Sequence, residues 1–597
     1  RSDGKHGACP PSYRLRTPAT IRARPTVPQP GPVGYNLSAP APPPGQTIMT
    51  HVPPMLLALA FLFPPASTLP AAPLRSRTAN LAPRRPTLPP LRPGGPSHPV
   101  DRLIIAHTRS TSPTVLQPLT DLAFARRVHL DLVGLLPTPS QTARFLSDPP
   151  ATRRDLLITR LLEDRQGYAA HWMVFWNDCL RNAYRGTGFI DDGRRQISGW
   201  LYRLLYENTP YDQFAHQLIS PVNGSGGFIL GIKWRGVVNA SQQREIQAAQ
   251  SVSQVFLGTN LKCASCHDSF INDWTLDDAY ALAAVFSERP LELHRCNKPT
   301  GRTARIGFLF PSLGTITATR SRTERLRRLA DLLVSRKNGR FTRTIVNRLW
   351  ATLLGHGLVE PVDEMERPAW NPDLLDWLAE DLADNGFNLK HTLRTICQSR
   401  AYQSQAIPAP RKSKTYLFGG PYVRRMTAEQ FVDAVTALTG SPLVPDKLMA
   451  KRDGRGQGGQ LPRLQAVVDA DKSNSRPLLI RAAFVMPDPL QRALGRPNRE
   501  QIVTRRDSLA TMLQAMELTN GSSLNKALQH GAAHWLPTAK KDLNLTLDRL
   551  FQTGFSRSPT RSESQQLTEL AGTPLTAEGL QDVLWTLLMH PDFQLIH

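Results

Sequence analysis

The chain has little cysteine and no apolar run long enough to cross a bilayer. Its 597 residues include six cysteines, too few for a disulfide framework in a protein of this length. The longest apolar run, at residues 55–63, is well short of the roughly 20 residues that a spanning helix needs. The alternation of strands and helices that marks nucleotide-binding folds is also missing. The sequence thus argues against disulfide-stapled, membrane-spanning and doubly wound nucleotide-binding proteins.

Positive charge is plentiful, with 72 Lys and Arg against 48 Asp and Glu and a formal net charge of +24. Such an excess suits a nucleic acid, an anionic surface or an acidic redox partner. The arginines are scattered through the predicted helices and the N-terminal part, however, and do not form one stripe. We therefore do not expect nucleic-acid binding.

The N-terminal part divides into three segments that lack the spacing of a folded core. Residues 1–48 are rich in Pro, Arg and Gly, and we expect a disordered or mis-started segment. Residues 49–72 hold the apolar run followed by small residues, as in a secretory signal, which predicts export and a mature start between Ser67 and Pro73. Residues 73–97 are Pro- and Arg-rich and predict a linker.

After the linker the chain has helical periodicity nearly throughout. We predict a mostly α protein with two helical domains, 98–300 and 320–590, joined by long loops. One short run, Gly227–Val238, has extended alternation, and Asp453–Gly459 predicts an exposed loop. The predicted helices are Arg153–Leu162, Gln196–Tyr206, Gln243–Leu257, Leu276–Phe286, Phe341–Leu354, Leu374–Leu382, Leu389–Cys397, Thr504–Leu518, Leu543–Phe555 and Ala577–Met589.

The motif that carries chemistry is Cys263-Ala264-Ser265-Cys266-His267. Two thiols two residues apart can each add to a haem vinyl group, and the histidine that follows can bind the iron. Such a match is far from expected by chance in a chain with six cysteines and 15 histidines. The motif falls between two predicted helices, so we expect a small cytochrome c-like attachment loop for haem c.

Two other readings of the motif stay open. Cys263 and Cys266 can bind zinc together with His267, His294 or Cys296, because a Cys-x-x-Cys knuckle and a later His-x-Cys suit tetrahedral coordination. A disulfide without any cofactor is the third reading, and export would favour it. For a haem iron the sixth ligand is unassigned: Met173 is a candidate, but a methionine among aromatic residues is more often core.

Carboxylates elsewhere offer weaker signals. Glu360 and Asp363-Glu364 are spaced to hold a hard cation, although a loop surface explains them equally well. Asp178 and Arg181 suit a polar cleft or simply a solvated helix face.

Many short matches in order resemble the planctomycete cytochrome-associated secreted proteins of unknown function. The resemblance covers roughly His98 to His597 and implies a secreted, two-domain architecture with the motif in the first domain. The matching segments are Phe124–Pro139, Trp176–Asp178, Asn208–Phe214, Val255–Gly258, Asn347–Trp350, Gly357–Asp363, Leu374–Leu378, Ser399–Tyr402, Leu494–Pro497 and Leu584–Leu588.

The chain departs from that family in two ways. Ser269 stands where the family usually has a second histidine after the motif, and no separate N-terminal Cys-x-x-Cys-His is present, since Cys9 stands alone. We expect an exported haem protein active in redox or electron transfer in the periplasm or cell envelope. A zinc- or disulfide-stabilised envelope binding protein, or a redox enzyme acting on extracellular polymers, is the alternative. Redox partner, substrate and oligomeric state are left open.

Overall fold

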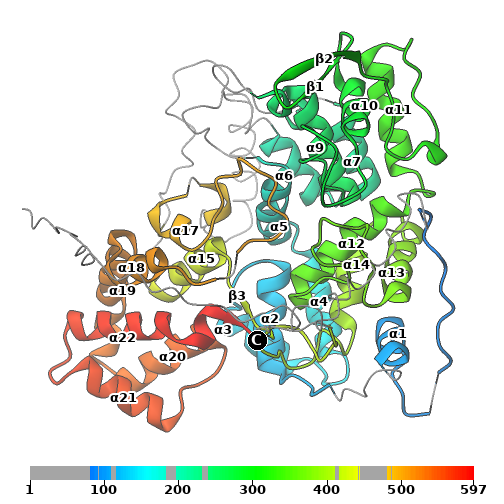
Figure 1. Ribbon diagram of the computed structural model, residues 1–597. Helices are drawn as coiled ribbons and strands as arrows, with labels where there is room; N and C mark the ends of the chain where they lie inside the picture. Colours follow the sequence, from blue (N-terminus) through cyan, green and yellow to red (C-terminus); the bar gives the residue numbers. More distant parts are fainter. Residues whose placement is uncertain are drawn as a thin grey trace, which may run out of the picture. The chain divides into compact units, whose positions relative to one another are not determined.

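Helices make up most of the described chain, which confirms the predicted fold class (Figure 1). The computed structural model describes residues 81–91, 93–108, 116–182, 197–222, 224–230, 239–410, 416–440, 443, 481–485, 487–507 and 509–597. All of these belong to one unit, Pro73–His597. The predicted segments 1–48 and 49–72 and the Asp453–Gly459 loop lie outside the described residues.

The N-terminal and central helices carry the segments that precede and follow the Cys-x-x-Cys-His motif. They are α1 Pro99–Thr108, α2 Asp121–Leu132, α3 Pro139–Ser147, α4 Arg153–Glu163, α5 Arg165–Cys179, α6 Ser198–Tyr206, α7 Tyr211–Ile219, α8 Gly227–Leu230, α9 Arg244–Leu257, α10 Leu276–Phe286, α11 Arg322–Val334, α12 Gly339–Leu354, α13 Pro372–Asp384 and α14 Leu389–Gln398. Short 3-10 turns are η2 Ala240–Gln242 and η3 Pro311–Leu313.

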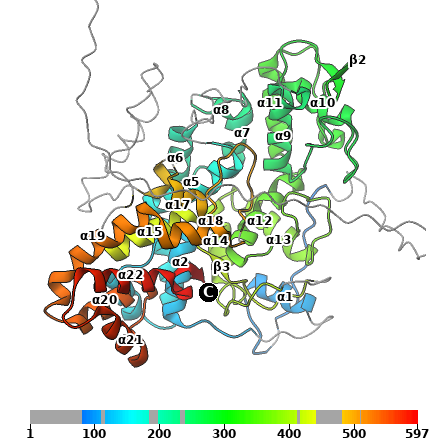
Figure 2. The ribbon, with the colours of Figure 1, turned by 60° about the vertical axis from the view of Figure 1, so that its left-hand side comes forward.

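The C-terminal helices gather on one side of the described unit (Figures 1 and 2). They are α15 Ala428–Thr439, α17 Pro489–Ala493, α18 Met512–Asn520, α19 Ser522–Ala539, α20 Leu543–Phe555, α21 Arg561–Ala571, α22 Ala577–Met589 and α23 Pro591–Gln594, with η5 Ala482–Phe484. Helices α19 and α22 pack along each other, and α15 packs on α19 and α20.

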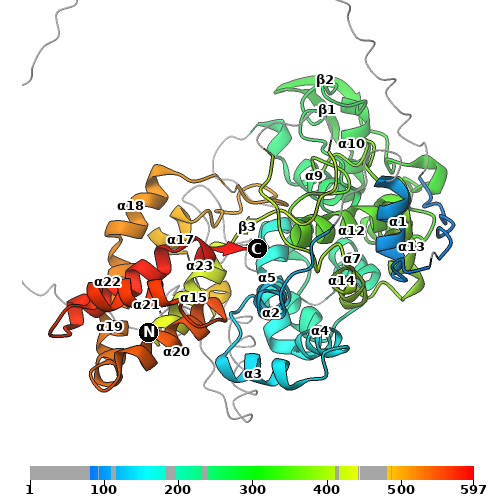
Figure 3. The same ribbon diagram turned by 90° about the horizontal axis from the view of Figure 1, so that it is seen from below.

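Strands are few and form two small antiparallel pairs in the described residues. Strand β1 (Glu292–Arg295) and strand β2 (Lys298–Thr303) form a hairpin beside α10. Strand β3 (Arg424–Arg425) pairs with β4 (Leu595–Ile596), which brings the C-terminal residues back to the middle of the chain (Figure 3). The buried Arg126 guanidinium of α2 donates to the carbonyls of Phe593 and Leu595 and so holds the C-terminal residues in this position.

Two hydrophobic cores organise the helices, and the larger one draws on both predicted domains. The larger core joins α1–α7 and α9–α10 to α11–α14. The smaller core is built by α15 and the helices after it, with Leu130 and Leu136 contributed from the N-terminal part. Helices predicted to belong to different domains therefore share one interior.

Most predicted helices are present, several with the expected limits. Helices α10, α20 and α22 begin and end as predicted. The predicted helix Thr504–Leu518 was wrong in its first half: helix α18 begins at Met512, where Thr511 caps it. The predicted extended run also failed in its described part, because Gly227–Leu230 is the short helix α8.

A group of buried charges joins α5, α15 and the segment before α18. The Asp178 carboxylate on α5 accepts from Arg499 at 2.7 Å and from Arg506 at 2.6 Å. Arg506 also donates to Glu429 on α15 at 2.6 Å, and Arg496 lies 3.1 Å from the same carboxylate. Burial alone would raise the pKa of Glu429, but Arg506 and Arg496 outweigh it and hold that pKa well below its usual range. Asp178 thus fastens helices and does not line an open cleft.

The described part of the predicted linker is tied to the helices. Leu81 is buried, and its carbonyl accepts from the Gly339 amide at 2.8 Å. Arg84 pairs with Asp376 at 3.0 Å and Arg85 with Glu380 at 3.0 Å. The first contact is to the start of α12, and the two arginine contacts run along α13.

We therefore expect a non-specific protease to leave a stable product that begins before Leu81, because the backbone of 81–91 is held by these contacts. N-terminal sequencing of the product measures this. The double variant Arg84→Ala, Arg85→Ala should shift the start toward His98. A wild-type product that already begins near His98 would contradict the expectation.

His129 of α2 should make the fold sensitive to mild acid. Its ring is buried, and burial lowers its pKa to about 4, although the Ala125 carbonyl 2.7 Å from Nδ1 partly opposes the shift. The unfolded chain binds a proton near pH 6.5 and the folded chain only near 4, so stability is lost as pH falls from 6.5 to 4. One such group contributes about 1.4 kcal/mol per pH unit over that window. Chemical denaturation at several pH values between 4 and 6.5 measures how the free energy of unfolding falls with pH. That fall should be smaller by this amount per pH unit in His129→Gln than in wild type, and equal pH dependences would refute the assignment.

Candidate functional site

The Cys-x-x-Cys-His motif lies in a turn between α9 and α10, as the sequence predicted. Helix α9 ends at Leu257, and its C-cap residue Gly258 has a left-handed φ of 56°. A β-carbon at Gly258 would come within 2.3 Å of the Met365 side chain, so glycine is required for both conformation and space. The Met365 amide in turn donates to the Gly258 carbonyl at 2.9 Å. The start of the turn is therefore fixed by a segment about 100 residues away in sequence.

The motif itself is one tight helical turn. The Ser265 amide donates to the Leu261 carbonyl at 2.9 Å, and the His267 amide donates to the Cys263 carbonyl at 3.2 Å. Residues three and four apart share a face of such a turn, which groups Cys263 with Cys266 and His267. Ala264 and Ser265 face inward and are buried, whereas both cysteines and His267 are half-buried.

The His267 ring is held by one hydrogen bond and one ring contact. Its Nδ1 lies 2.7 Å from the Asp268 carbonyl oxygen, so Nδ1 carries the proton and donates. This tautomer leaves the lone pair of Nε2 available to a metal. The ring packs against Phe270 with centroids 4.6 Å apart.

A single carboxylate, Glu366, holds both ends of the loop that carries the motif. Its Oε1 accepts from the Thr259 hydroxyl at 2.8 Å and from the Trp274 indole at 3.2 Å. The Arg340 guanidinium lies 3.3 Å from the same atom and supplies the balancing charge. Sequence reasoning missed Glu366, since nothing in its neighbourhood marks it as a partner of residues 259 and 274.

Arg348 of α12 fastens the helix that leads into the motif. Its buried guanidinium donates to the Gln254 carbonyl at 2.5 Å, to the Val255 carbonyl and to Asp363 at 2.7 Å. These are carbonyls near the C-terminal end of α9, which carry partial negative charge. The sequence marks Arg348 only as part of the family-like segment Asn347–Trp350. It does not predict the contacts of Arg348 with α9.

The carboxylates suggested for a hard cation have other partners. Asp363 binds Arg348 and accepts from Thr504 at 2.7 Å. Glu360 pairs with Arg505 at 2.7 Å and accepts from the Gly357 amide at 2.7 Å. Their oxygens stabilise loops, and in the described part of the chain no group of three or more His, Cys, Asp or Glu side chains is arranged to hold a metal.

Of the later residues suggested for a zinc site, Cys296 lies beside the motif. Cys296, at the tip of the β1–β2 hairpin, donates its amide to the Cys266 carbonyl at 2.8 Å. His294 lies on β1, where its carbonyl accepts from the Tyr280 hydroxyl at 3.4 Å. The five cysteines in the described ranges are all free thiols. The structure thus brings Cys296 beside the motif without forming a tetrahedral set.

Met173, the candidate sixth ligand, lies inside α5 with no exposed surface and belongs to the larger hydrophobic core. A thioether that binds an iron at a surface turn must reach that surface. Its position favours a packing role, and the sixth ligand stays unassigned.

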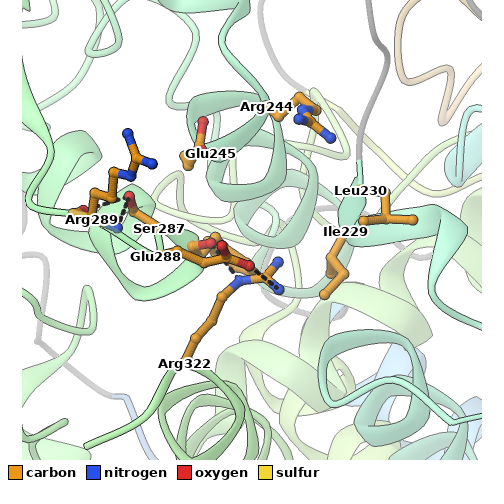
Figure 4. Close-up of a pocket in the computed structure, with 9 residues that line it drawn as sticks. Ile229, Leu230, Arg244, Glu245, Ser287, Glu288, Arg289 and Arg322 are labelled. Atoms are coloured by element: carbon orange, nitrogen blue, oxygen red, sulfur yellow. Dashed lines mark hydrogen bonds and ion pairs between the residues drawn. The ribbon is translucent and has the colours of Figure 1, made fainter.

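The surface carries a groove away from the motif. It has a volume of about 360 Å³ and is bordered by the starts of α9 and α11 and the end of α10 (Figure 4). Arg322 reaches Glu288 across it at 3.8 Å, and Arg244 and Arg289 are exposed. Glu245, Glu288 and the arginines give the groove a mixed charge, and the Ser287 hydroxyl that also lines it donates to the Arg289 carbonyl at 2.6 Å.

Comparison with known families places two domains on this chain. The model of PSCyt2, a protein of unknown function (DUF1549), matches residues 99–290, and the model of PSD1, a protein of unknown function (DUF1553), matches residues 324–571. The chain thus contains both domains of a two-domain family of unknown function. Neither the curated proteins nor the solved structures gave a match. The motif turn falls in the first matched region, whereas Arg348 and Glu366 fall in the second.

The hydrogen bonds that Glu366 accepts from Thr259 and Trp274 lead to a prediction. We expect Glu366→Ala to raise amide hydrogen exchange in residues 258–275 and to lower stability by about 1–3 kcal/mol, because two donors and the buried Arg340 lose their acceptor. Glu364→Ala is the matched control, since that carboxylate pairs with the exposed Arg367. Unchanged exchange in 258–275 would show that the loop does not depend on Glu366.

Proposed function

We propose that this chain is an exported protein that binds haem c covalently at Cys263 and Cys266 and takes part in redox or electron transfer in the cell envelope. The observation that carries the proposal is the motif turn: two half-buried thiols and an imidazole with its Nε2 lone pair free. Haem bound there would supply one-electron chemistry through its iron. Cys263 and Cys266 would hold it, and His267 would bind the iron.

The surface beside His267 has the chemistry that a porphyrin covers. Phe270 is 86% exposed and Ile271 is 65% exposed, although both are large apolar side chains. Exposed apolar surface next to polar rims marks a site of contact with another molecule. A flat apolar macrocycle attached to the adjacent thiols would shield them from water.

The anchoring of the loop supports the same proposal. Thr259 and Trp274 are held by Glu366, and the Asp268 carboxylate accepts from the Leu276 amide at 2.9 Å at the start of α10. A rigid attachment site reorganises little when an electron arrives or leaves. The scaffold therefore suits electron transfer better than it suits a flexible binding loop.

Export and an acidic partner complete the proposal. The signal-like segment 49–72 is consistent with haem attachment outside the cytoplasm. In the described residues every helix is too short or too polar to span a bilayer. The net charge of +24 favours a partner of opposite sign.

A zinc- or disulfide-stabilised envelope binding protein is the second candidate. The backbone bond from Cys296 to Cys266 favours it, since a third thiol lies beside the motif. Zinc would need a rearrangement that makes Cys263, Cys266, Cys296 and a histidine converge.

Covalent attachment tests the proposal directly. The chain exported in a host that matures c-type cytochromes should keep haem after denaturation, and its reduced pyridine adduct should show the blue-shifted band of saturated vinyl groups. The double variant Cys263→Ser, Cys266→Ser should lose the covalent haem, because both thioether bonds are gone. His267→Ala should alter the absorption of the iron.

The variant Cys296→Ser separates the two candidates. Haem attachment should survive this change, whereas a zinc site that uses Cys296 should lose its metal. Matured protein with neither a Soret band nor covalent haem, but with about one chelatable zinc per chain, would overturn the haem proposal.

A further inference from the structure

The hairpin tip that carries Cys296 is fixed against the motif. The Cys296 amide donates to the Cys266 carbonyl at 2.8 Å, and the neighbouring Asn297 side chain accepts from the Ala240 amide at 3.2 Å. With the N···O distance at 2.8 Å, standard bond lengths keep the two α-carbons within about 6.7 Å of each other, inside the range that a disulfide spans. Cys266 and Cys296 are therefore neighbours in space.

The conformation of Cys296 is unusual for a cysteine. Arg295 pairs with Lys298, so Cys296 and Asn297 form a two-residue hairpin turn. Cys296 has a φ of 56°, in the left-handed region that such turns normally fill with glycine, asparagine or aspartate. A cysteine that is kept in a backbone conformation unfavourable for it points to a role for its side chain.

Solvent access separates Cys263, Cys266 and Cys296 from the other two described cysteines. Cys296 is exposed and Cys266 is half-buried, so a thiol–disulfide exchange protein can reach both. Cys179 and Cys397 are fully buried, and burial raises the pKa of the Cys179 thiol to about 12. Thiols of that kind are inert, which leaves Cys263, Cys266 and Cys296 as the reactive thiols among the described residues.

We propose that Cys266 and Cys296 form a disulfide in the haem-free exported protein, and that this bond withholds one of the two haem-attachment thiols until it is reduced. Each thiol loses its hydrogen and one S–S bond forms. The two electrons and two protons pass to the disulfide of an exchange protein, which becomes a dithiol. A reducing dithiol protein reverses the step and frees Cys266. The second half of this proposal rests on the proposed haem attachment, whereas the disulfide itself does not.

Peptide mapping of haem-free protein tests the disulfide. The chain is exported in a host without c-type maturation, blocked with a thiol reagent and digested unreduced with trypsin. Cleavage after Lys262, Arg295 and Arg302 separates the peptide with Cys263 and Cys266 from the peptide with Cys296. The expected product is the linked pair of peptides, which reductant separates. The link should persist in Cys263→Ser and disappear in Cys266→Ser and in Cys296→Ser.

Two results would overturn the disulfide. One is wild-type protein in which Cys263, Cys266 and Cys296 are all blocked as free thiols, and the other is a bond between Cys263 and Cys266 inside one peptide. The regulatory half is tested by the rate of covalent haem incorporation in a maturing host. Under oxidising conditions Cys296→Ser should incorporate haem several-fold faster than wild type, and reductant should abolish the difference. Equal rates would refute the withholding role. A linked pair in protein that never takes haem would refute the proposed function and leave the disulfide standing.

Discussion

Buried arginines that end on carbonyls and carboxylates of distant segments are the interaction on which this structure depends. Arg126, Arg348 and Arg499 are each less than 10% exposed, yet all donate to partners more than 90 residues away. Leaving a charge in a protein interior is costly unless it is paired and hydrogen-bonded, so each guanidinium fixes the position of what it touches. Part of the large arginine content is thus used inside the fold, which weakens the case for a nucleic-acid partner.

This fastening makes the candidate site a property of both matched domains. The first supplies the thiols and His267, but Arg348 and Glu366 of the second hold the end of α9 and both ends of the motif loop. The shared hydrophobic core has the same consequence, because α11–α14 pack into the interior that surrounds α9 and α10. A first domain made alone would lose its clamp as well as a wall of its core, so experiments on the motif require the full chain.

The sequence predicted the helices whose apolar spacing is regular and located the motif between two of them. It failed where tertiary contacts override local pattern. Residues 504–511 have helical composition, but Arg505 and Arg506 extend to reach Glu360 and Glu429, and the helix begins only at Met512. Glu366 and the contact of Cys296 with Cys266 were invisible for another reason: they join positions about 30 to 100 residues apart, and no periodicity within one element records such pairs.

Ser269, two residues after His267, takes part in the backbone structure of the turn. Its amide donates to the Trp274 carbonyl at 2.9 Å, a bond that any residue except proline can make, and its hydroxyl accepts from the Ile271 amide at 3.3 Å. Ser269 therefore supports the turn but supplies no imidazole beside His267. An iron held here would have one histidine from the turn, and any further protein ligand would come from another segment. A second protein ligand would favour electron transfer, whereas an open coordination position would favour redox catalysis.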